Sequence, residues 1–350
     1  MFIERYRRPE AMEIRKVQLT GGSSFVITLP KDWVNAQKIK KNDPLGLIVQ
    51  PDGTLLVTRD LAEGQFQREK RFDVSDIHEP TFLFRMLIGS YIAGYTTIII
   101  TSKTRIPAPI RLVVRDFSQM TIGPEVVEET DTTIILKDLL NPAEMPFENT
   151  IKRMFVIVKN MHLDAIMALE TRNKDLADDV IARDNDVDRL HWLIARQTNM
   201  ILKDAGLARK MGVSTSKVVN TYIISRIIER IGDHAVRLTE YGQKISEYQI
   251  DDIMLAAIRK ASTLALTLFD KSIVSYFNSD LRGSHKNIEH VEKLEEICEH
   301  INELAMEKDP FIAVSLRYIA ESIRRSGEYS GDISENIINY LVEEQMEEVP

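Results

Sequence analysis

The sequence predicts a multi-domain protein with a β-rich N-terminal segment, a small α/β module and a long all-α C-terminal part. Three patterns lead to this prediction. Short apolar runs alternate with Gly, Ser and Pro up to residue 60, strand-like and helix-like patterns alternate over residues 65–140, and apolar residues recur with a helical period from residue 146 onward. A length of 350 residues is consistent with two or three domains.

The N-terminal segment is predicted to form two hairpins around a short helix. Pro30 fits the first turn of a helix, where its missing N–H costs nothing, and Pro51-Asp-Gly53 has the composition of a hairpin turn. The expected elements are, in order, strands at 13–19 and 25–29, a helix at 31–34 and strands at 45–50 and 54–58.

The middle segment reads as a small α/β module. It contains no glycine-rich phosphate loop and no nucleophile elbow, so packing or dimerisation is a better interpretation than catalysis. Asn141-Pro142 marks the linker to the helical part. The expected elements are a strand at 68–74, a helix at 80–93, a strand at 96–101, a helix at 107–117 and two strands within 125–136.

Six helices forming two three-helix repeats are predicted after the linker. Gly206, Gly212, Gly283 and Pro310 support the breaks between them. The expected helices lie near 146–173, 175–204, 213–246, 250–279, 284–306 and 309–345. The predicted domains are therefore 1–60, 61–142 and 143–350, with helical repeats at about 146–246 and 250–345.

Charge is distributed unevenly along the chain. Residues 1–42 carry nine Lys and Arg against four Asp and Glu, a balance of +5, whereas the remaining 36 Lys and Arg and 49 Asp and Glu give −13. A basic segment on an acidic protein is typical of a nucleic-acid contact, because phosphate neutralisation supplies most sequence-independent affinity. A basic edge that only improves solubility is the alternative.

Composition indicates a protein of the cytoplasm without membrane insertion. No stretch approaches the roughly 18 uninterrupted apolar residues of a membrane-spanning helix, and the N-terminus lacks the apolar run of a signal peptide. The single cysteine, Cys298, has no partner for an intramolecular disulfide and is interpreted as a core residue.

Two short acidic segments are the strongest functional signal. Asp184 and Asp188, like Glu229 and Asp233, are four residues apart in helical sequence, so both carboxylates of each pair project from one helix face. If the two helices pack together, four carboxylates converge and favour a hard or borderline metal cation. The alternative is two separate, solvated acidic faces. Isoleucines around Glu229 and the mid-helix Gly232 favour a buried helix with a close neighbour.

These segments resemble the paired acidic motifs of the PhoU family of phosphate-uptake regulators. The resemblance is carried by Glu229-Arg-Ile-Gly-Asp-His-Ala235 together with Asp184 and Asp188 on the preceding helix. It implies tandem three-helix bundles whose acidic motifs face each other and bind iron or zinc; magnesium and manganese are the alternative ions. His191, Trp192 and His234 are interpreted as packing residues rather than ligands.

A second copy of the motif can be traced at Ile323-Arg-Arg-Ser-Gly-Glu-Tyr329. Here Arg324 stands in place of the first acid, and Val291 stands where the first repeat has Asp184. A guanidinium opposes a bound cation, so a weaker second site is predicted, with Arg324 in an ion pair to one of its acids. The candidate ligands of this weaker site are Glu295, Glu328 and Asp332, with Glu292 beside them.

The N-terminal order of elements resembles the AbrB/SpoVT family of DNA-binding domains. Arg15-Lys-Val17 and Leu29-Pro-Lys31 match the landmarks of that family, in which hairpins from two chains interlace into one small swapped-hairpin β-barrel. The resemblance implies a homodimer or higher homo-oligomer that binds DNA, and the alternative is a barrel that only dimerises. The candidate DNA contacts are Arg15, Lys16, Ser23, Ser24, Lys31, Lys38, Lys40 and Lys41.

The complete arrangement resembles archaeal phosphate-uptake regulators. It predicts a non-enzymatic, DNA-binding transcriptional regulator of phosphate uptake, whose helical domain senses phosphate status or contacts a phosphate transporter. Two alternatives stay open. One is a signalling adaptor for the transporter that does not bind DNA, and the other is a di-metal carboxylate oxidase, although the paired Glu-x-x-His segments of ferritin-like sites are missing.

Overall fold

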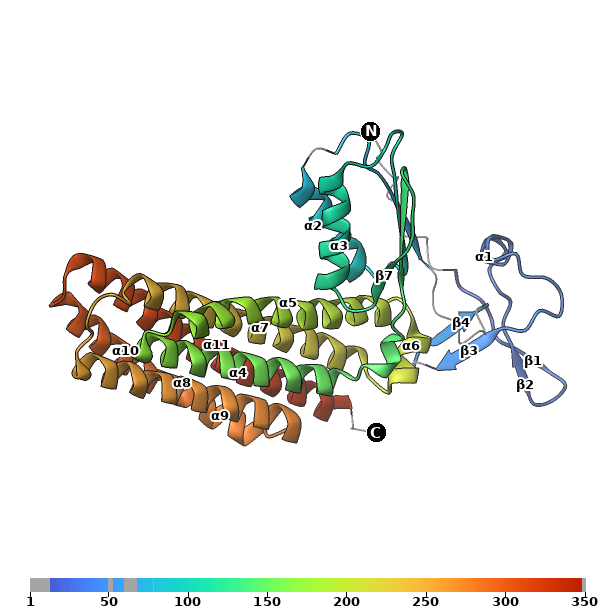
Figure 1. Ribbon diagram of the computed structural model, residues 1–350. Coiled ribbons are helices and arrows are strands. Elements are labelled where there is room, and N and C mark those ends of the chain that lie inside the picture. The colour runs from blue at the N-terminus through green and yellow to red at the C-terminus, as the bar shows by residue number, and fades with distance from the viewer. Residues whose placement is uncertain (1–12, 50–52, 60–67, 78, 348–350) are drawn as a thin grey trace. The chain divides into compact units, whose positions relative to one another are not determined.

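The computed structural model describes residues 13–49, 53–59, 68–77 and 79–347. The chain consists of two compact units, Met1–Gln65 and Phe66–Pro350 (Figure 1). The predicted domain boundary at residue 60 and most of the predicted Pro51-Asp-Gly53 turn lie outside the described residues. Among the described helices, none combines the length and the hydropathy that crossing a bilayer requires.

The first unit contains two separate hairpins and a short helix. Strand β1 (Gln18–Thr20) pairs antiparallel with β2 (Ser24–Val26), and β3 (Gly46–Val49) pairs antiparallel with β4 (Leu55–Thr58). Helix α1 (Lys31–Ala36) lies between them. Gly21 and Gly22 have φ of 65° and 85°, a left-handed conformation that glycine adopts without strain, and so allow the tight turn.

Two predicted strands of this unit are too long. The strand expected at 13–19 begins only at Gln18, and the one expected at 25–29 ends at Val26. Among the described residues each of these two strands pairs only with the other, and the pairing stops where that partner ends. The described residues of a single chain form two two-stranded sheets and no closed barrel, so the swapped-hairpin barrel stays a prediction that requires a second chain.

The second unit begins with the α/β module. Its mixed sheet has the order β5-β6-β8-β7, with β5 parallel to β6 and the other neighbours antiparallel. Helices α2 and α3 cover one face, and Leu87, Ile100 and Phe117 are completely buried between the layers. All predicted elements are confirmed as β5 (Glu69–Asp73), α2 (Pro80–Ile92), β6 (Thr97–Thr101), α3 (Ala108–Met120), β7 (Pro124–Glu129) and β8 (Thr133–Asp138).

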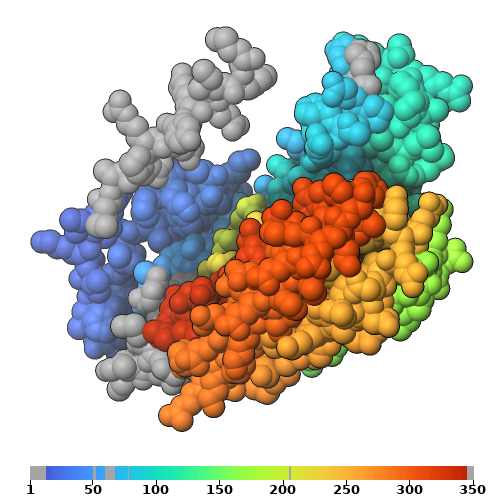
Figure 2. Space-filling model, turned by 90° about the vertical axis from the view of Figure 1, so that its left-hand side faces the viewer, coloured from blue at the N-terminus to red at the C-terminus, as the bar shows by residue number. Residues whose placement is uncertain are grey.

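A bundle of long helices follows the short 3-10 turn η1 (Pro142–Glu144). The first repeat consists of α4 (Phe147–Thr171), α5 (Lys174–Ile201), α6 (Ala205–Met211) and α7 (Thr215–Lys244). The second consists of α8 (Asp252–Asn278), α9 (Leu281–Glu289), α10 (Val291–Met306) and α11 (Pro310–Glu347). Figure 2 shows helices of the second repeat, in orange and red, side by side along one face. One continuous core joins both repeats.

Two helix predictions need correction. The helix expected at 284–306 is two helices, because the chain breaks at His290 between α9 and α10. The segment around Gly206 and Gly212, predicted as a break, contains the short helix α6. The side chain of Asp204 accepts hydrogen bonds from the N–H groups at its start, and Gly212 ends it with φ of 63°.

The two repeats share their first helix turn and their motif glycines, although α5 is continuous and its counterpart is broken at His290. In the first, α4 ends on the left-handed residue Arg172 and Asn173 caps the next helix; in the second, α8 ends on left-handed Ser279 and Asp280 caps α9. The motif glycines also match. A Cβ on Gly232 would contact Val187, and a Cβ on Gly327 would collide with Leu294 at the corresponding place. The internal repeat predicted from the sequence is therefore present in three dimensions.

Candidate metal centre and nucleic-acid interface

Helices α5 and α7 bring the two acidic motifs of the first repeat together. Gly232 of α7 faces both neighbouring helices: a Cβ there would lie 3.4 Å from Cγ2 of Val158 on α4 and 3.7 Å from Cγ1 of Val187 on α5, which are ordinary van der Waals distances. The Oδ1 atom of Asp184 is 3.9 Å from the same point. Asp184 therefore lies over the turn of α7 that carries Glu229 and Asp233, as the paired motifs predict.

Burial raises the pKa of all four carboxylates, and repulsion from other members of the cluster adds to the effect for Asp184, Asp188 and Glu229. Burial, followed by repulsion from Asp233, raises the pKa of Glu229 to about 7 and that of Asp184 to about 6. For Asp188, burial and then repulsion from Asp184 and Asp233 raise the pKa to about 6. The pKa of Asp233 is also raised by burial, although nearby arginines offset part of the effect. A cluster with these properties is stabilised by protons or by a cation.

Glu229 is the most buried member, with 7% of the residue exposed. Its Oε1 atom accepts a hydrogen bond from Nη1 of Arg226 at 2.8 Å, whereas Oε2 is buried and has no partner among the described residues. An unpaired carboxylate oxygen in a buried position costs free energy unless a cation or proton satisfies it. Arg226 was missed as the counter-ion, although its spacing of three residues before Glu229 gives the signal.

The chemistry of this donor set fits a hard or borderline cation, but the side chains are not in a ligating arrangement. Among the residues that the structure describes, no three His, Cys, Asp or Glu side chains are positioned to hold one metal ion. Asp184, Asp188 and Asp233 are only half-buried, so their carboxylates have room to rotate toward a common point. The structure thus brings the two acidic motifs close together, with their oxygens not converged on one point.

In the second repeat a guanidinium replaces part of the acidic cluster. Arg324 forms ion pairs with Glu328 and with Glu321, and Arg325 pairs with the same two acids. The predicted ion pair between Arg324 and Glu328 is therefore confirmed. Glu295 also lies close enough to favour the charged form of Arg324, whereas the exposed Asp332 lies near Glu335, Arg230 and Arg325.

The histidines and the tryptophan near the first motif pack as predicted. The Nδ1 atom of His191 lies 3.0 Å from the hydroxyl of Ser225, and its ring stacks on Tyr222. Trp192 packs against the core of the α/β module. His234 faces α11, where its ring contacts Tyr329. Cys298 is buried in the helical core, as expected.

All candidate DNA-contacting residues are exposed on the first unit. Arg15 is ion-paired with Glu13, and Lys16 lies just before β1. Lys38 has φ of 53° and ends α1: its N–H donates to the carbonyl of Asn35, and the next N–H, of Ile39, donates to the carbonyl of Val34. The remaining candidates are Ser23 in the β1–β2 turn, Ser24 at the start of β2, Lys31 at the start of α1, and Lys40 and Lys41 after it.

Comparisons with known proteins match the N-terminal unit and the first helical repeat. Residues 151–242 match the PhoU domain family, and residues 18–60 match the MazE family of bacterial antitoxins, described as antidote-toxin recognition proteins. A phosphate-specific transport system accessory protein PhoU homolog of Caulobacter vibrioides is 24% identical over 205 residues, which cover 56% of this chain and 86% of that protein. PhoU homolog 1 of Thermotoga maritima is 21% identical over 207 residues, covering 57% and 88%.

A solved structure shows the same helical fold. PhoU from Pseudomonas aeruginosa superposes with a TM-score of 0.50 at 16% identity and covers 57% of this chain and 96% of that one. PhoU from Streptococcus pneumoniae has a TM-score of 0.48 at the same identity, with coverage of 55% and 92%. Together with the paired acidic motifs and the repeated helices, the family matches identify a chain that joins an N-terminal domain of the MazE and AbrB type to a PhoU domain.

Proposed function

We propose that this protein is a DNA-binding transcriptional regulator of phosphate uptake. The observation that carries the proposal is the presence, in one chain, of an antitoxin-type N-terminal domain and a PhoU domain. The relatives are named as accessory proteins of phosphate-specific transport, which supports a regulatory rather than an enzymatic role. In this proposal the helical unit receives the phosphate signal and the N-terminal unit acts on DNA.

Exposed apolar side chains in the N-terminal unit support a dimeric DNA-binding form. In residues 13–49 and 53–59 no side chain is buried, and large apolar side chains are open to solvent. An unpaired hairpin with such a surface has marginal stability in water, whereas a second chain would cover it. The exposed apolar residues are Ile14, Val17, Leu19, Phe25, Val26, Ile27, Leu47, Val49, Leu55 and Leu56.

The acidic cluster supports a metal-dependent sensor. Asp184, Asp188, Glu229 and Asp233 would hold an iron or zinc ion, which would neutralise their mutual repulsion and fix α5 against α7. In the proposed mechanism Arg226 holds Glu229 in place on the buried side of the ion, and the three half-exposed aspartates would bind the ion from the solvent side. Contact with a phosphate transporter belongs to the same proposal and rests on the names of the relatives.

The proposal is tested by DNA binding of the full-length chain. Operator mapping on genomic fragments should find a preferred duplex, and affinity for it should fall steeply with salt because binding releases counterions. Replacing Arg15 and Lys16 by alanine should weaken binding and flatten the salt dependence, by about one unit of slope for each phosphate that is no longer neutralised.

A matched control removes the same charge elsewhere. Lys260 and Lys271 are exposed on α8 and form no ion pair with a described residue, so their double alanine variant should bind DNA like the wild type. An unchanged salt slope in the Arg15 and Lys16 variant would show that these two side chains are not phosphate contacts. Salt-independent binding without a preferred duplex in the wild type would refute the DNA function and favour an adaptor whose N-terminal unit only dimerises.

A further inference from the structure

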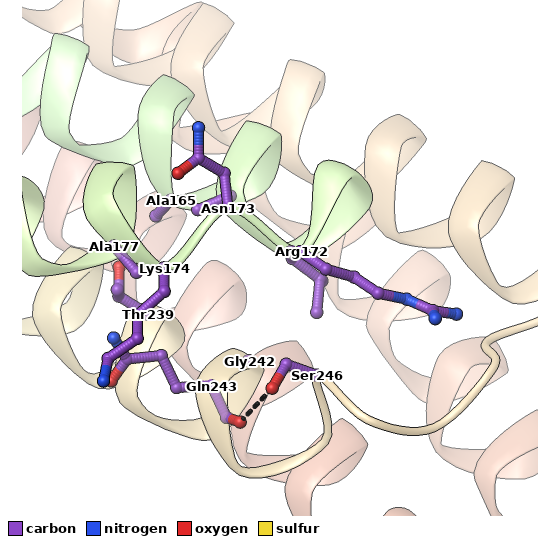
Figure 3. A pocket seen from close by; sticks show the side chains of 11 residues that line it. Ala165, Arg172, Asn173, Lys174, Ala177, Thr239, Gly242, Gln243 and Ser246 are labelled. Atoms are coloured by element: carbon purple, nitrogen blue, oxygen red, sulfur yellow. Dashed lines mark hydrogen bonds between the residues drawn. The ribbon is translucent and has the colours of Figure 1, made fainter.

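A cavity of about 260 Å³ lies where the α4–α5 turn meets the end of α7, away from the acidic cluster. Figure 3 shows Arg172, Asn173 and Lys174 at the turn, with Thr239, Gly242 and Gln243 on α7. The floor is apolar. It is formed by small or aliphatic residues of α4 and α5, namely Ala165, Ala168, Leu169 and Ala177.

Two cations at this cavity have no partner. Arg172 and Lys174 form no ion pair or side-chain hydrogen bond with a residue that the structure describes, and Figure 3 shows Arg172 extending freely from the turn. Arg259 binds Glu170 at 2.8 Å, and the amide of Gln243 donates to Asp178 at 2.8 Å, whereas Asp175, next to Lys174 in the sequence, has no ion pair with a described residue. None of these acids lines the cavity, so both charged groups in its lining are positive.

The carbonyl groups at the end of α7 are satisfied within the chain. The carbonyl of Gln243 accepts from both the N–H and the hydroxyl of Ser246, the latter at 2.8 Å, and the carbonyl of Gly242 accepts from the N–H of Ile245. The negative end of this helix is thus partly neutralised at the cavity. The groups left free to bind a ligand are mainly donors, which suit an anion.

The second repeat shows that the fold does not need this cavity. In the equivalent positions Leu281 stands for Lys174, Ile337 for Gly242 and Leu341 for Ser246. Ile337 and Leu341 are buried with 2% and 8% exposed, so apolar side chains occupy the place that is open in the first repeat. At Gly242 a Cβ would already lie 3.3 Å from Cδ1 of Leu169. One repeat fills the space with apolar groups and the other leaves it open and basic.

We propose that this cavity binds a small phosphate-containing anion. Arg172 would contact the phosphate oxygens through its planar guanidinium and Lys174 through its point charge. The alanine floor would take the apolar part of a ligand such as a nucleoside monophosphate, and inorganic phosphate would use the cationic end alone. The site is separate from the proposed metal and DNA sites and does not depend on them.

The test measures saturable binding of three probes to the full-length protein by calorimetry. The probes are inorganic phosphate, adenosine monophosphate and, as an anion of similar shape, sulfate. Saturable binding of phosphate, of the nucleotide or of both is the expected result, and the tighter ligand identifies the source of the phosphate group. Sulfate, a tetrahedral oxyanion without a proton to donate, should bind comparably to inorganic phosphate, because the free groups of the cavity are donors. The absence of saturable binding of every probe would overturn the proposal, and binding of sulfate alone would show an adventitious ion only.

Double variants test whether the anion binds at the cavity. Arg172→Ala with Lys174→Ala should weaken it about tenfold or more, since charge-assisted hydrogen bonds are removed. The same effect is expected for Lys174→Leu with Ser246→Leu, which copies the second repeat. Lys260→Ala with Lys271→Ala matches the charge change and should stay within about twofold of the wild type. Equal weakening by this control would show non-specific attraction and refute the site.

A comparison of two double variants separates this proposal from the metal site. Asp188→Asn with Asp233→Asn removes two members of the acidic cluster and should leave phosphate binding unchanged. Loss of phosphate binding in that variant, with binding retained in the Arg172 and Lys174 variant, would place the anion at the acidic cluster and overturn the cavity assignment.

Discussion

Arg196 of α5 donates to the carboxylate of Asp138 at 2.5 Å, and both side chains are almost fully buried, with 2% and 4% exposed. The same guanidinium also donates to the carbonyl of Tyr91 and lies 4.8 Å from the centre of that ring. One arginine of the helical bundle thus bonds to a strand end and a helix of the α/β module. Because Asp184 and Asp188 lie on the same helix, the module is joined to the element that carries the acidic motif.

The first prediction concerns this joint. Arg196→Met leaves Asp138 buried without its counter-ion and should lower the free energy of unfolding by about 3 to 5 kcal/mol, measured by urea denaturation. Arg196→Met combined with Asp138→Leu removes both charges and should recover much of the loss. A single variant as stable as the wild type would show that the ion pair does not hold the module on α5.

The second prediction concerns metal content. Protein purified without chelator should contain iron or zinc, and Asp188→Asn with Asp233→Asn should abolish it in elemental analysis, because two ligand charges are removed. Asp175→Asn with Asp186→Asn removes equal charge from α5 outside the cluster and is the control. Equal metal content in wild type and cluster variant would refute the metal site.

The third prediction concerns the unequal repeats. Since Arg324 already pairs with Glu328, the second cluster should bind metal more weakly than the first. Arg324→Glu with Val291→Asp restores the acids of the first repeat and should raise the number of metal ions per chain in a titration. Two sites of equal affinity in the wild type would contradict this expectation.

The fourth prediction concerns pH. The pKa of Glu229 is raised from 4.5 to about 7 in the folded protein, so its contribution to stability is complete below pH 4.5 and is lost as pH rises through 7. In metal-free protein Glu229→Gln should therefore be more stable than the wild type by about 1 to 3 kcal/mol at pH 8, with the difference shrinking toward pH 4.5.

Added metal should make the wild type more stable than Glu229→Gln, because only the wild type gains the full stabilisation of a bound cation. Thermal unfolding with chelator and with added zinc, each at pH 5 and pH 8, measures all four conditions. If the chelated wild type were the more stable protein at pH 8, the raised pKa that burial and repulsion give to Glu229 would be wrong.

Much of this architecture is encoded in local patterns. The strands and helices of the module follow apolar periodicity, and the acidic motifs are recognisable because their four-residue spacing fixes a helix face. The break at His290 was missed because nothing in its immediate sequence forces a helix to end. Its N–H bonds to the carbonyl of Asn287, whose side chain is in turn held by the carbonyl of Leu268 and by Ser334.

Long-range partners could not be predicted in the same way. Arg196 looks like an ordinary basic residue on a helix until Asp138 and Tyr91, distant in sequence, come into contact with it. The cavity at the α4–α5 turn could not be predicted either. It forms only because Gly242 and Ser246 face a turn that is distant from them in sequence. Arg324 was the exception, since the internal repeat showed which acid it replaces.

The lack of buried side chains among the described residues of the N-terminal unit makes its folding depend on the number of chains in a cell. Over residues 13–49 and 53–59 a single chain buries no side chain, whereas the helical unit has a continuous core of its own. Folding of the N-terminal unit would then be second order in chain concentration, whereas the helical unit would fold independently of concentration. Halving the number of chains would cut the population of paired N-terminal units by more than half at low abundance, and so make copy number itself a regulatory input.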